Sequence, residues 1–128
     1  MYTELDFNVE LKEDVPEDVV AILNAMASPN FKIIDLPTPP HLFFGTRNWE
    51  VLFKMDSYYF KAVTRRSFFI DPIGKQWILN VRSNLENYDS EIEKFIDWIM
   101  PYVDAEPGEF LGFYRYEETQ TPTLIHAR

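Results

Sequence analysis

A strict alternation of apolar and polar side chains over residues 2–12 constrains the fold more than any other feature of the chain. The apolar side chains share one parity: Leu5, Phe7, Val9 and Leu11. The polar side chains share the other: Glu4, Asp6, Asn8 and Glu10. A period of two is typical of a β-strand with one buried face and one face in water. The sequence therefore predicts a sheet that is covered on one face and carries a row of carboxylates on the other.

Two segments have the apolar spacing of amphipathic helices instead. The first is predicted over residues 16–27, because a proline and several acids mark its start and Ser28-Pro29 ends it. The second opens near Asp89, a candidate N-cap, and has this apolar stripe: Ile92, Phe95, Ile96, Ile99 and Val103. Pro101 falls near its end, where a proline kinks or stops a helix.

Further strands are predicted over residues 31–36, 49–54, 58–70, 76–83, 110–116 and 121–126. The turn signal Asp71-Pro72-Ile73-Gly74-Lys75 joins the third and fourth of these into a hairpin, and its long first strand is expected to bend or bulge near Arg65. The last strand belongs at a sheet edge, because Pro122 lacks the N–H that a central strand donates.

Runs of strands interrupted by single helices favour an α+β fold. We expect one domain over residues 1–128, with a single antiparallel sheet of about five to seven strands and two helices packed on one face. Trp49, Trp77 and Trp98 fall on or beside the apolar positions of their segments, so we expect them in the core.

Composition excludes several classes of function. The chain has no cysteine, which excludes a disulfide framework, a thiolate zinc site and a cysteine nucleophile. The first residues lack the basic start and apolar run of a signal peptide, and no run reaches the ~20 apolar residues of a membrane span. We therefore expect a cytoplasmic protein. The four glycines form neither a phosphate loop nor a dinucleotide fingerprint, and no cofactor is expected.

The net charge of −9 bears on partners. Such a field repels nucleic acid and anionic membranes and speeds association with basic proteins. We expect the partner to be another protein, of basic character; the oligomeric state stays open, with a homodimer among the alternatives. The candidate acidic face comprises Glu4, Asp6, Glu10, Glu91, Glu93 and Asp97. The alternative is that these acids form a solvated surface that keeps the protein soluble.

The acid is concentrated towards the two ends of the chain, whereas residues 37–85 hold seven bases and three acids. The predicted sheet therefore has a positive centre and negative flanks. Candidate residues for binding an anion or a small molecule are Tyr59, Lys61, Arg65, Arg82, Arg115 and His41. The alternative for the bases is pairing across strands with the carboxylate row of the first strand, which is common on sheet surfaces.

No catalytic residue and no metal site is predicted. The two histidines, His41 and His126, are far apart in sequence and lack metal-ligand spacing. A catalytic histidine needs a nucleophile and an orienting acid within hydrogen-bond reach, and no serine here has the glycine context of a nucleophile elbow. Adjacent carboxylates such as Glu117 and Glu118 point to opposite faces if they lie on a strand.

The segment Gly112–Glu118, followed by Pro122–Ile125, is similar to the ending of small uncharacterised bacterial and phage proteins, some of which resemble immunity proteins of toxin systems. The resemblance implies a small cytoplasmic binding protein without enzymatic activity, and it implies no particular binding residue. The leading hypothesis is a non-enzymatic protein, of inhibitory or accessory type, that contacts another protein through an acidic or aromatic surface. The runner-up is a small-molecule or anion-binding domain, and a small enzyme of unknown class comes third.

Overall fold

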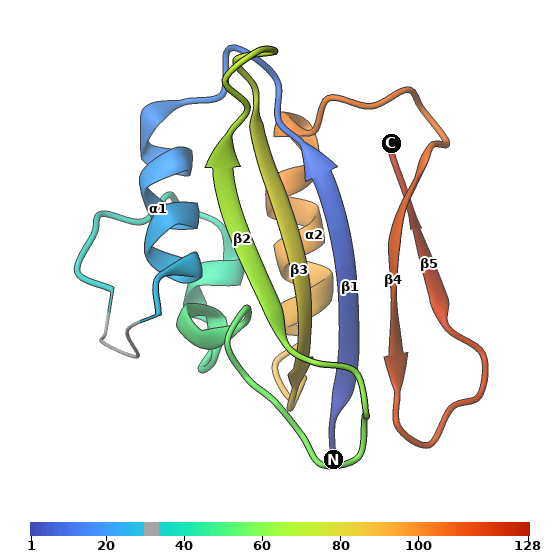
Figure 1. Cartoon of the computed structure of the whole chain (residues 1–128). Helices are drawn as coiled ribbons and strands as arrows, with labels where there is room; N and C mark the ends of the chain where they lie inside the picture. The colour runs from blue at the N-terminus through green and yellow to red at the C-terminus, as the bar shows by residue number, and fades with distance from the viewer. Residues whose placement is uncertain (30–33) are drawn as a thin grey trace.

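The sheet is built around the first strand. The computed structural model describes residues 1–29 and 34–128, and in these residues five antiparallel strands have the order β2-β3-β1-β4-β5 (Figure 1). Their bounds are Thr3–Glu10 for β1, Arg65–Ile70 for β2, Trp77–Leu85 for β3, Phe110–Tyr116 for β4 and Thr123–His126 for β5. The α+β fold with one antiparallel sheet is therefore as predicted from the sequence.

Both α-helices pack on the same face of the sheet. The buried stripes of α1 (Glu17–Ala27) and α2 (Glu91–Ile99) join Leu5, Phe7 and Val9 of β1 in one apolar core. In Figure 1, α2 lies behind β3 and β1, and α1 lies beside β2. The apolar parity of the first strand is thus the covered face, as predicted. We call the helix-covered side of the sheet the inner face and the other side the outer face.

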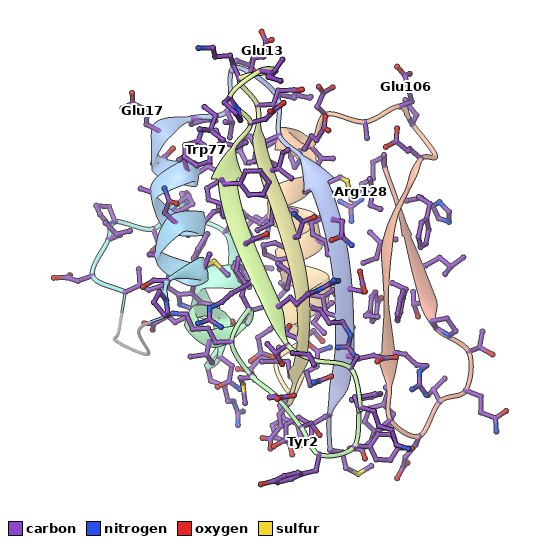
Figure 2. All side chains as sticks on the ribbon, in the orientation of Figure 1. Tyr2, Glu13, Glu17, Trp77, Glu106 and Arg128 are labelled. Carbon is purple, nitrogen blue, oxygen red and sulfur yellow. The ribbon has the colours of Figure 1, made fainter. Side chains whose placement is uncertain are left out.

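Aromatic side chains fill the space between α2 and the two short 3-10 helices η1 (Leu42–Gly45) and η2 (Trp49–Val51). Phe43 stacks on Trp98 with a centroid distance of 5.9 Å, and it meets Trp49 edge-on at 6.0 Å. Trp77 packs at the margin of the core (Figure 2). It stacks on Phe68 with a centroid distance of 4.7 Å. The three tryptophans therefore serve packing, as expected.

Several boundaries agree with the sequence. The helix predicted over residues 16–27 is α1, which begins one residue later, at Glu17. α2 ends at Ile99, directly before the 3-10 helix η3 (Met100–Tyr102) that contains Pro101. The Asp71–Lys75 turn closes the β2–β3 hairpin, with Asp71 N donating to Gln76 O at 2.8 Å. β5 lies at a sheet edge, as the proline at position 122 indicated.

The strand predicted over residues 49–54 is wrong, because η2 begins there. Trp49, Leu52 and Phe53 are buried, and their spacing of three and four residues fits a helical turn as well as it fits a short apolar run. Lys54, also buried, donates from Nζ to Ala25 O at the end of α1 at 3.4 Å.

The long strand predicted over residues 58–70 is also wrong in its first half. β2 begins only at Arg65, and residues 56–64 cross the outer face of the sheet near the start of β1 (Figure 1). Asn84 N donates to Met55 O at 3.0 Å, so the position beside β3 that a longer strand would occupy is already taken. We call residues 56–64 the crossing segment.

Two smaller predictions also need correction. Asp89 does not cap α2: Ser90 is the N-cap residue, in a left-handed conformation with φ +56°, and the carboxylate of Asp89 turns to Arg47 instead. Half of the strand predicted over residues 31–36 lies outside the described residues, and its described half, residues 34–36, is not in a strand. None of the described helices is long and apolar enough to cross a membrane.

Candidate functional site

The β4–β5 hairpin extends beyond the part of the sheet that the helices cover (Figure 1). Its inner face therefore borders a hollow of about 420 Å³ that lies next to the start of α2. The hollow is lined mainly by tyrosine, threonine and a few other polar side chains, among them Tyr88, Tyr114, Tyr116, Thr121, Thr123 and Glu93. We call it the tyrosine groove.

Strand alternation places two of the three tyrosines. Tyr114 and Tyr116 are two residues apart on β4, so both point to the inner face. Tyr114 lies opposite Leu5 on one side and opposite Thr123 on the other. Tyr116 lies opposite Thr3 and donates from its hydroxyl to Met1 Sδ at 3.2 Å.

The third tyrosine comes from the loop between β3 and α2. Asp89 anchors this loop by accepting from Arg47 N at 2.8 Å and from the Arg47 guanidinium at 3.2 Å. The Arg47 guanidinium in turn lies 5.8 Å from the centre of the Tyr88 ring. The position of Tyr88 in the groove thus depends on a contact between two loops that are distant in sequence.

This contact predicts a pH dependence of stability. Donation from the Arg47 backbone N–H, and then from its guanidinium, lowers the pKa of Asp89 below its usual value of 3.8. A lowered folded-state pKa adds stability above the unfolded-state pKa, and that stability is lost as the pH falls from about 4 through the folded-state pKa. We expect Asp89→Asn to lower the melting temperature at pH 7, with the difference from wild type closing in acid.

Thermal melts of the two proteins over a pH series measure this. Asp14→Asn, at an exposed position that makes none of these contacts, is the matched control and should change the melting temperature little at any pH. A difference between Asp89→Asn and wild type that is the same in acid as at pH 7 would contradict the proposed role of the carboxylate.

The surroundings of the tyrosine groove are negative. Burial and, after it, the charge of Glu93 raise the pKa of Tyr114. Burial followed by Glu118 and Glu117 raises the pKa of Tyr116. Two cationic groups line the groove, and both are already engaged. Arg115 donates from Nε to Glu4 and from Nη1 to Thr119 O at 2.9 Å. The ammonium group of Met1 donates to the Tyr88 hydroxyl at 3.5 Å and lies 4.0 Å from Glu117 Oε1. The groove therefore favours a cationic ligand over an anionic one.

An unpaired sheet edge runs beside the groove. β5 is the last strand in the sheet order, and in the described part of the chain no further strand pairs with it. Its outward backbone N–H and C=O groups are therefore open to a strand from another chain. Leu124, on the outer face of β5, is also half exposed.

The candidate basic residues divide into two groups. Arg82 is only 6% exposed and donates to Glu4 Oε2 at 2.7 Å, while Arg115 donates to the other oxygen of the same carboxylate at 3.0 Å. Phe60 of the crossing segment covers both guanidiniums, at 6.0 and 5.2 Å from its ring centre. Arg82 and Arg115 therefore pair across strands with a carboxylate of β1, which was the alternative considered for the bases. Arg82 is unavailable to a ligand.

The remaining members of the predicted basic strip are exposed but do not share a strand. Lys61 lies in the crossing segment and Arg65 starts β2, both exposed to solvent. Tyr59, also exposed, donates from its hydroxyl to Glu117 O at 2.8 Å and so ties the crossing segment to the end of β4. The continuous strip expected on one long strand therefore does not exist.

The six candidate acidic residues do not form one face. Asp6 and Glu10 lie on the outer face of β1, whereas the exposed acids of α2, Glu93 and Asp97, lie on the helix side. Glu4 and Glu91 are buried: Glu4 between its two arginines, and Glu91 because its carboxylate accepts from the backbone N–H groups of Asn48 and Asp89. The prediction of a single acidic face is wrong, because two of these carboxylates hold the chain together internally.

His41 caps the first 3-10 helix. Its Nδ1 accepts from Phe43 N at 3.0 Å, so its Nε2 carries the proton and donates to Asp97 Oδ2 at 2.9 Å. Both ring nitrogens are thus occupied, and neither is left to act as a base. The other oxygen of Asp97 accepts from Arg128 at 2.8 Å. Within the described residues, no group of three or more His, Asp or Glu side chains could hold a metal ion.

Comparison with known proteins gives no relative: no family model, no curated protein and no solved structure matches the chain. The tyrosine groove is therefore identified from its geometry alone. Part of it was visible in the sequence, because Tyr114 and Tyr116 share a parity and Thr121 and Thr123 follow on the expected partner strand. Tyr88 and Glu93 gave no such signal, since only the fold brings them to the hairpin.

Proposed function

We propose that this protein is a non-enzymatic binding protein that holds an extended, basic segment of another protein in the tyrosine groove, alongside β5. The observation that carries the proposal is the combination, in one place, of three tyrosines, nearby carboxylates and an unpaired strand edge. Its chemistry is recognition of a peptide, without a covalent step.

The groove has the size and the residues of a recognition site. Its volume of about 420 Å³ lies within the range of roughly 300–1,000 Å³ that ligand sites occupy. Tyrosine is enriched at the centres of protein interfaces, because its ring buries a large apolar area and its hydroxyl still forms hydrogen bonds. The threonine hydroxyls of β5 and the loop before it add further donors and acceptors.

The strand edge accounts for an extended ligand rather than a helical one. A peptide that pairs with β5 satisfies main-chain hydrogen bonds of both chains and directs every second side chain towards the inner face. Those side chains would enter the tyrosine groove. Lysine or arginine at these positions would meet the field of Glu93, Glu117 and Glu118.

Selection from a phage-displayed library of peptides of random sequence tests the proposal. We expect enrichment of extended sequences with alternating lysine or arginine. Tyr116→Ala should weaken the binding of a selected peptide at least about tenfold, a loss typical of a central interface tyrosine. Raising the salt concentration should weaken binding further, because it screens the carboxylates. Isothermal titration calorimetry measures the dissociation constants of wild type and Tyr116→Ala at each salt concentration.

Tyr58→Ala is the matched control, since Tyr58 is a fully exposed tyrosine that does not line the groove. It should leave peptide affinity unchanged. Selection that yields no basic peptides, or equal losses for Tyr58→Ala and Tyr116→Ala, would refute the groove as the binding site. A cytoplasmic location and an inhibitory, immunity-type or accessory role remain part of the proposal, and their support is the sequence alone.

A further inference from the structure

A second hollow, of about 720 Å³, lies along edge strand β2. Its lining is basic, whereas the lining of the tyrosine groove includes the carboxylate of Glu93. The polar side chains that line it are Asn8, Thr64, Arg65, Arg66, Ser67 and Asn80. Two are cationic, and no described residue of the lining is acidic. Four other hollows on the described part of the molecule each have at least one carboxylate in their lining.

Arg65 carries a charge that the protein does not balance. It lies directly opposite Arg82 in the β2–β3 register, and like charges in this position destabilise a sheet. The charge of Arg82 is compensated by Glu4, but Glu4 is shared with Arg115 and has no free oxygen for Arg65. Among the ion pairs of the described residues, none involves Arg65. Arg65 therefore has a guanidinium free to bind an external anion.

The neighbours of Arg65 on the outer face supply hydrogen-bond donors. Ser67 Oγ accepts from Asn80 Nδ2 at 3.2 Å, which leaves the hydroxyl proton of Ser67 available to a ligand. Ser67 lies two residues after Arg65 on β2 and thus on the same face. A planar guanidinium next to hydroxyl donors is suited to an oxyanion, which it binds through two parallel hydrogen bonds.

The inner side of the hollow adds positive potential. Arg66 donates from Nε to Ala27 O at 3.1 Å, so its position is fixed at the end of α1 while its charge remains. Burial and, after it, the charge of Arg66 lower the pKa of Lys54. Cations thus border the hollow from two sides of β2.

We propose that this hollow is a phosphate-binding site, with Arg65 as the main contact and Ser67 as a second donor. The inference goes beyond peptide recognition in the tyrosine groove, because it rests on different residues and a ligand of opposite charge. The hollow is large compared with a bare phosphate ion, so the favoured ligand is a small organic phosphate monoester. Inorganic phosphate shares the recognised group and serves as the simpler probe.

Amide NMR spectra recorded during titration with glucose 6-phosphate, and separately with inorganic phosphate, test the site at constant ionic strength. We expect saturable shifts centred on residues 64–67 and 80, with tighter binding of the monoester. Arg65→Gln should weaken both at least about tenfold, and Ser67→Ala should weaken them less, because it removes a hydroxyl and no charge. Equal binding of the two probes would also support a phosphate site.

Arg128→Gln is the matched control, because Arg128 is an exposed arginine on the opposite side of the sheet, at Asp97 of α2. It should leave phosphate affinity unchanged, as should Tyr116→Ala in the tyrosine groove. Shifts spread over all basic residues, a lack of saturation, or equal affinity for wild type and Arg65→Gln would overturn the proposal. None of these outcomes affects the test of peptide binding.

Discussion

Replacing Gly112 by alanine should lower the free energy of unfolding by about 3 kcal/mol or more. Gly112 of β4 lies opposite Phe7 of the central strand, with φ +154°. A Cβ on Gly112 would lie 1.9 Å from Asp6 O and 2.9 Å from the Asp6 carbonyl carbon. Both are backbone atoms of β1 that cannot turn aside as a side chain could. The alanine variant must therefore separate β4 from β1, and urea unfolding measures the cost.

Two other glycines separate the cost of the steric clash from the cost of the backbone conformation. Gly45 has no heavy atom within 4 Å of a built Cβ and no positive φ, so Gly45→Ala should change stability by less than about 0.5 kcal/mol. Gly108 has equal space but φ +88°, so Gly108→Ala should cost about 1 kcal/mol for backbone conformation alone. If Gly112→Ala is no more harmful than Gly108→Ala, close contact between β4 and β1 does not contribute to the cost of the substitution.

Replacing Glu4 by glutamine should destabilise the protein by about 3 kcal/mol. Glu4 is 9% exposed and its two carboxylate oxygens bind Arg82 and Arg115. Without the carboxylate charge, Arg82 is left buried beneath Phe60 and loses the carboxylate that contacts it directly. Arg115 suffers less, because about a quarter of its side chain reaches solvent. Urea unfolding again supplies the measurement.

Glu10→Gln is the matched control, since Glu10 lies on the same strand and the same outer face but is exposed. It should change stability by less than about 0.5 kcal/mol. The double variant Glu4→Gln, Arg82→Met should recover much of the loss, because it removes the isolated charge as well as its partner. A Glu4→Gln variant as stable as Glu10→Gln would show that the buried network is not formed.

The regular elements could be predicted from the sequence because local pattern decides them. The alternation of residues 2–12 predicts both the strand and its covered face, and the turn at Asp71–Lys75 predicts the β2–β3 hairpin. The errors arose where local pattern is ambiguous. The apolar run at residues 49–54 fits a strand and a helical turn equally well, and the tyrosine-rich residues 58–64 are as strand-like in composition as β2 itself.

The sites depend on contacts between distant segments, and these are less predictable. The sequence offered pairing of the arginines with the first strand as one of two alternatives. That Glu4 binds both Arg82 and Arg115 could not be predicted, because it depends on β1 lying between β3 and β4. Arg65 was predicted as a candidate binding residue. Only the strand register, which places Arg65 opposite Arg82, shows that its charge has no partner on the neighbouring strand. Tyr88 reaches the groove because its loop contacts Arg47, and no periodic pattern in the sequence indicates that contact.

The central place of β1 has a consequence for synthesis on the ribosome. Thr3 pairs with Leu85 on one side and with Tyr116 on the other, so β1 is synthesised before both of the strands that it pairs with. Until β3 and β4 have left the ribosome exit tunnel, Leu5, Phe7 and Val9 have no sheet partners, and both backbone edges of β1 are bare. Pairings this far apart in sequence slow folding. The nascent chain is therefore exposed to aggregation while the residues between β1 and the end of β4 are synthesised, and a chaperone that shields β1 would raise the yield of folded protein.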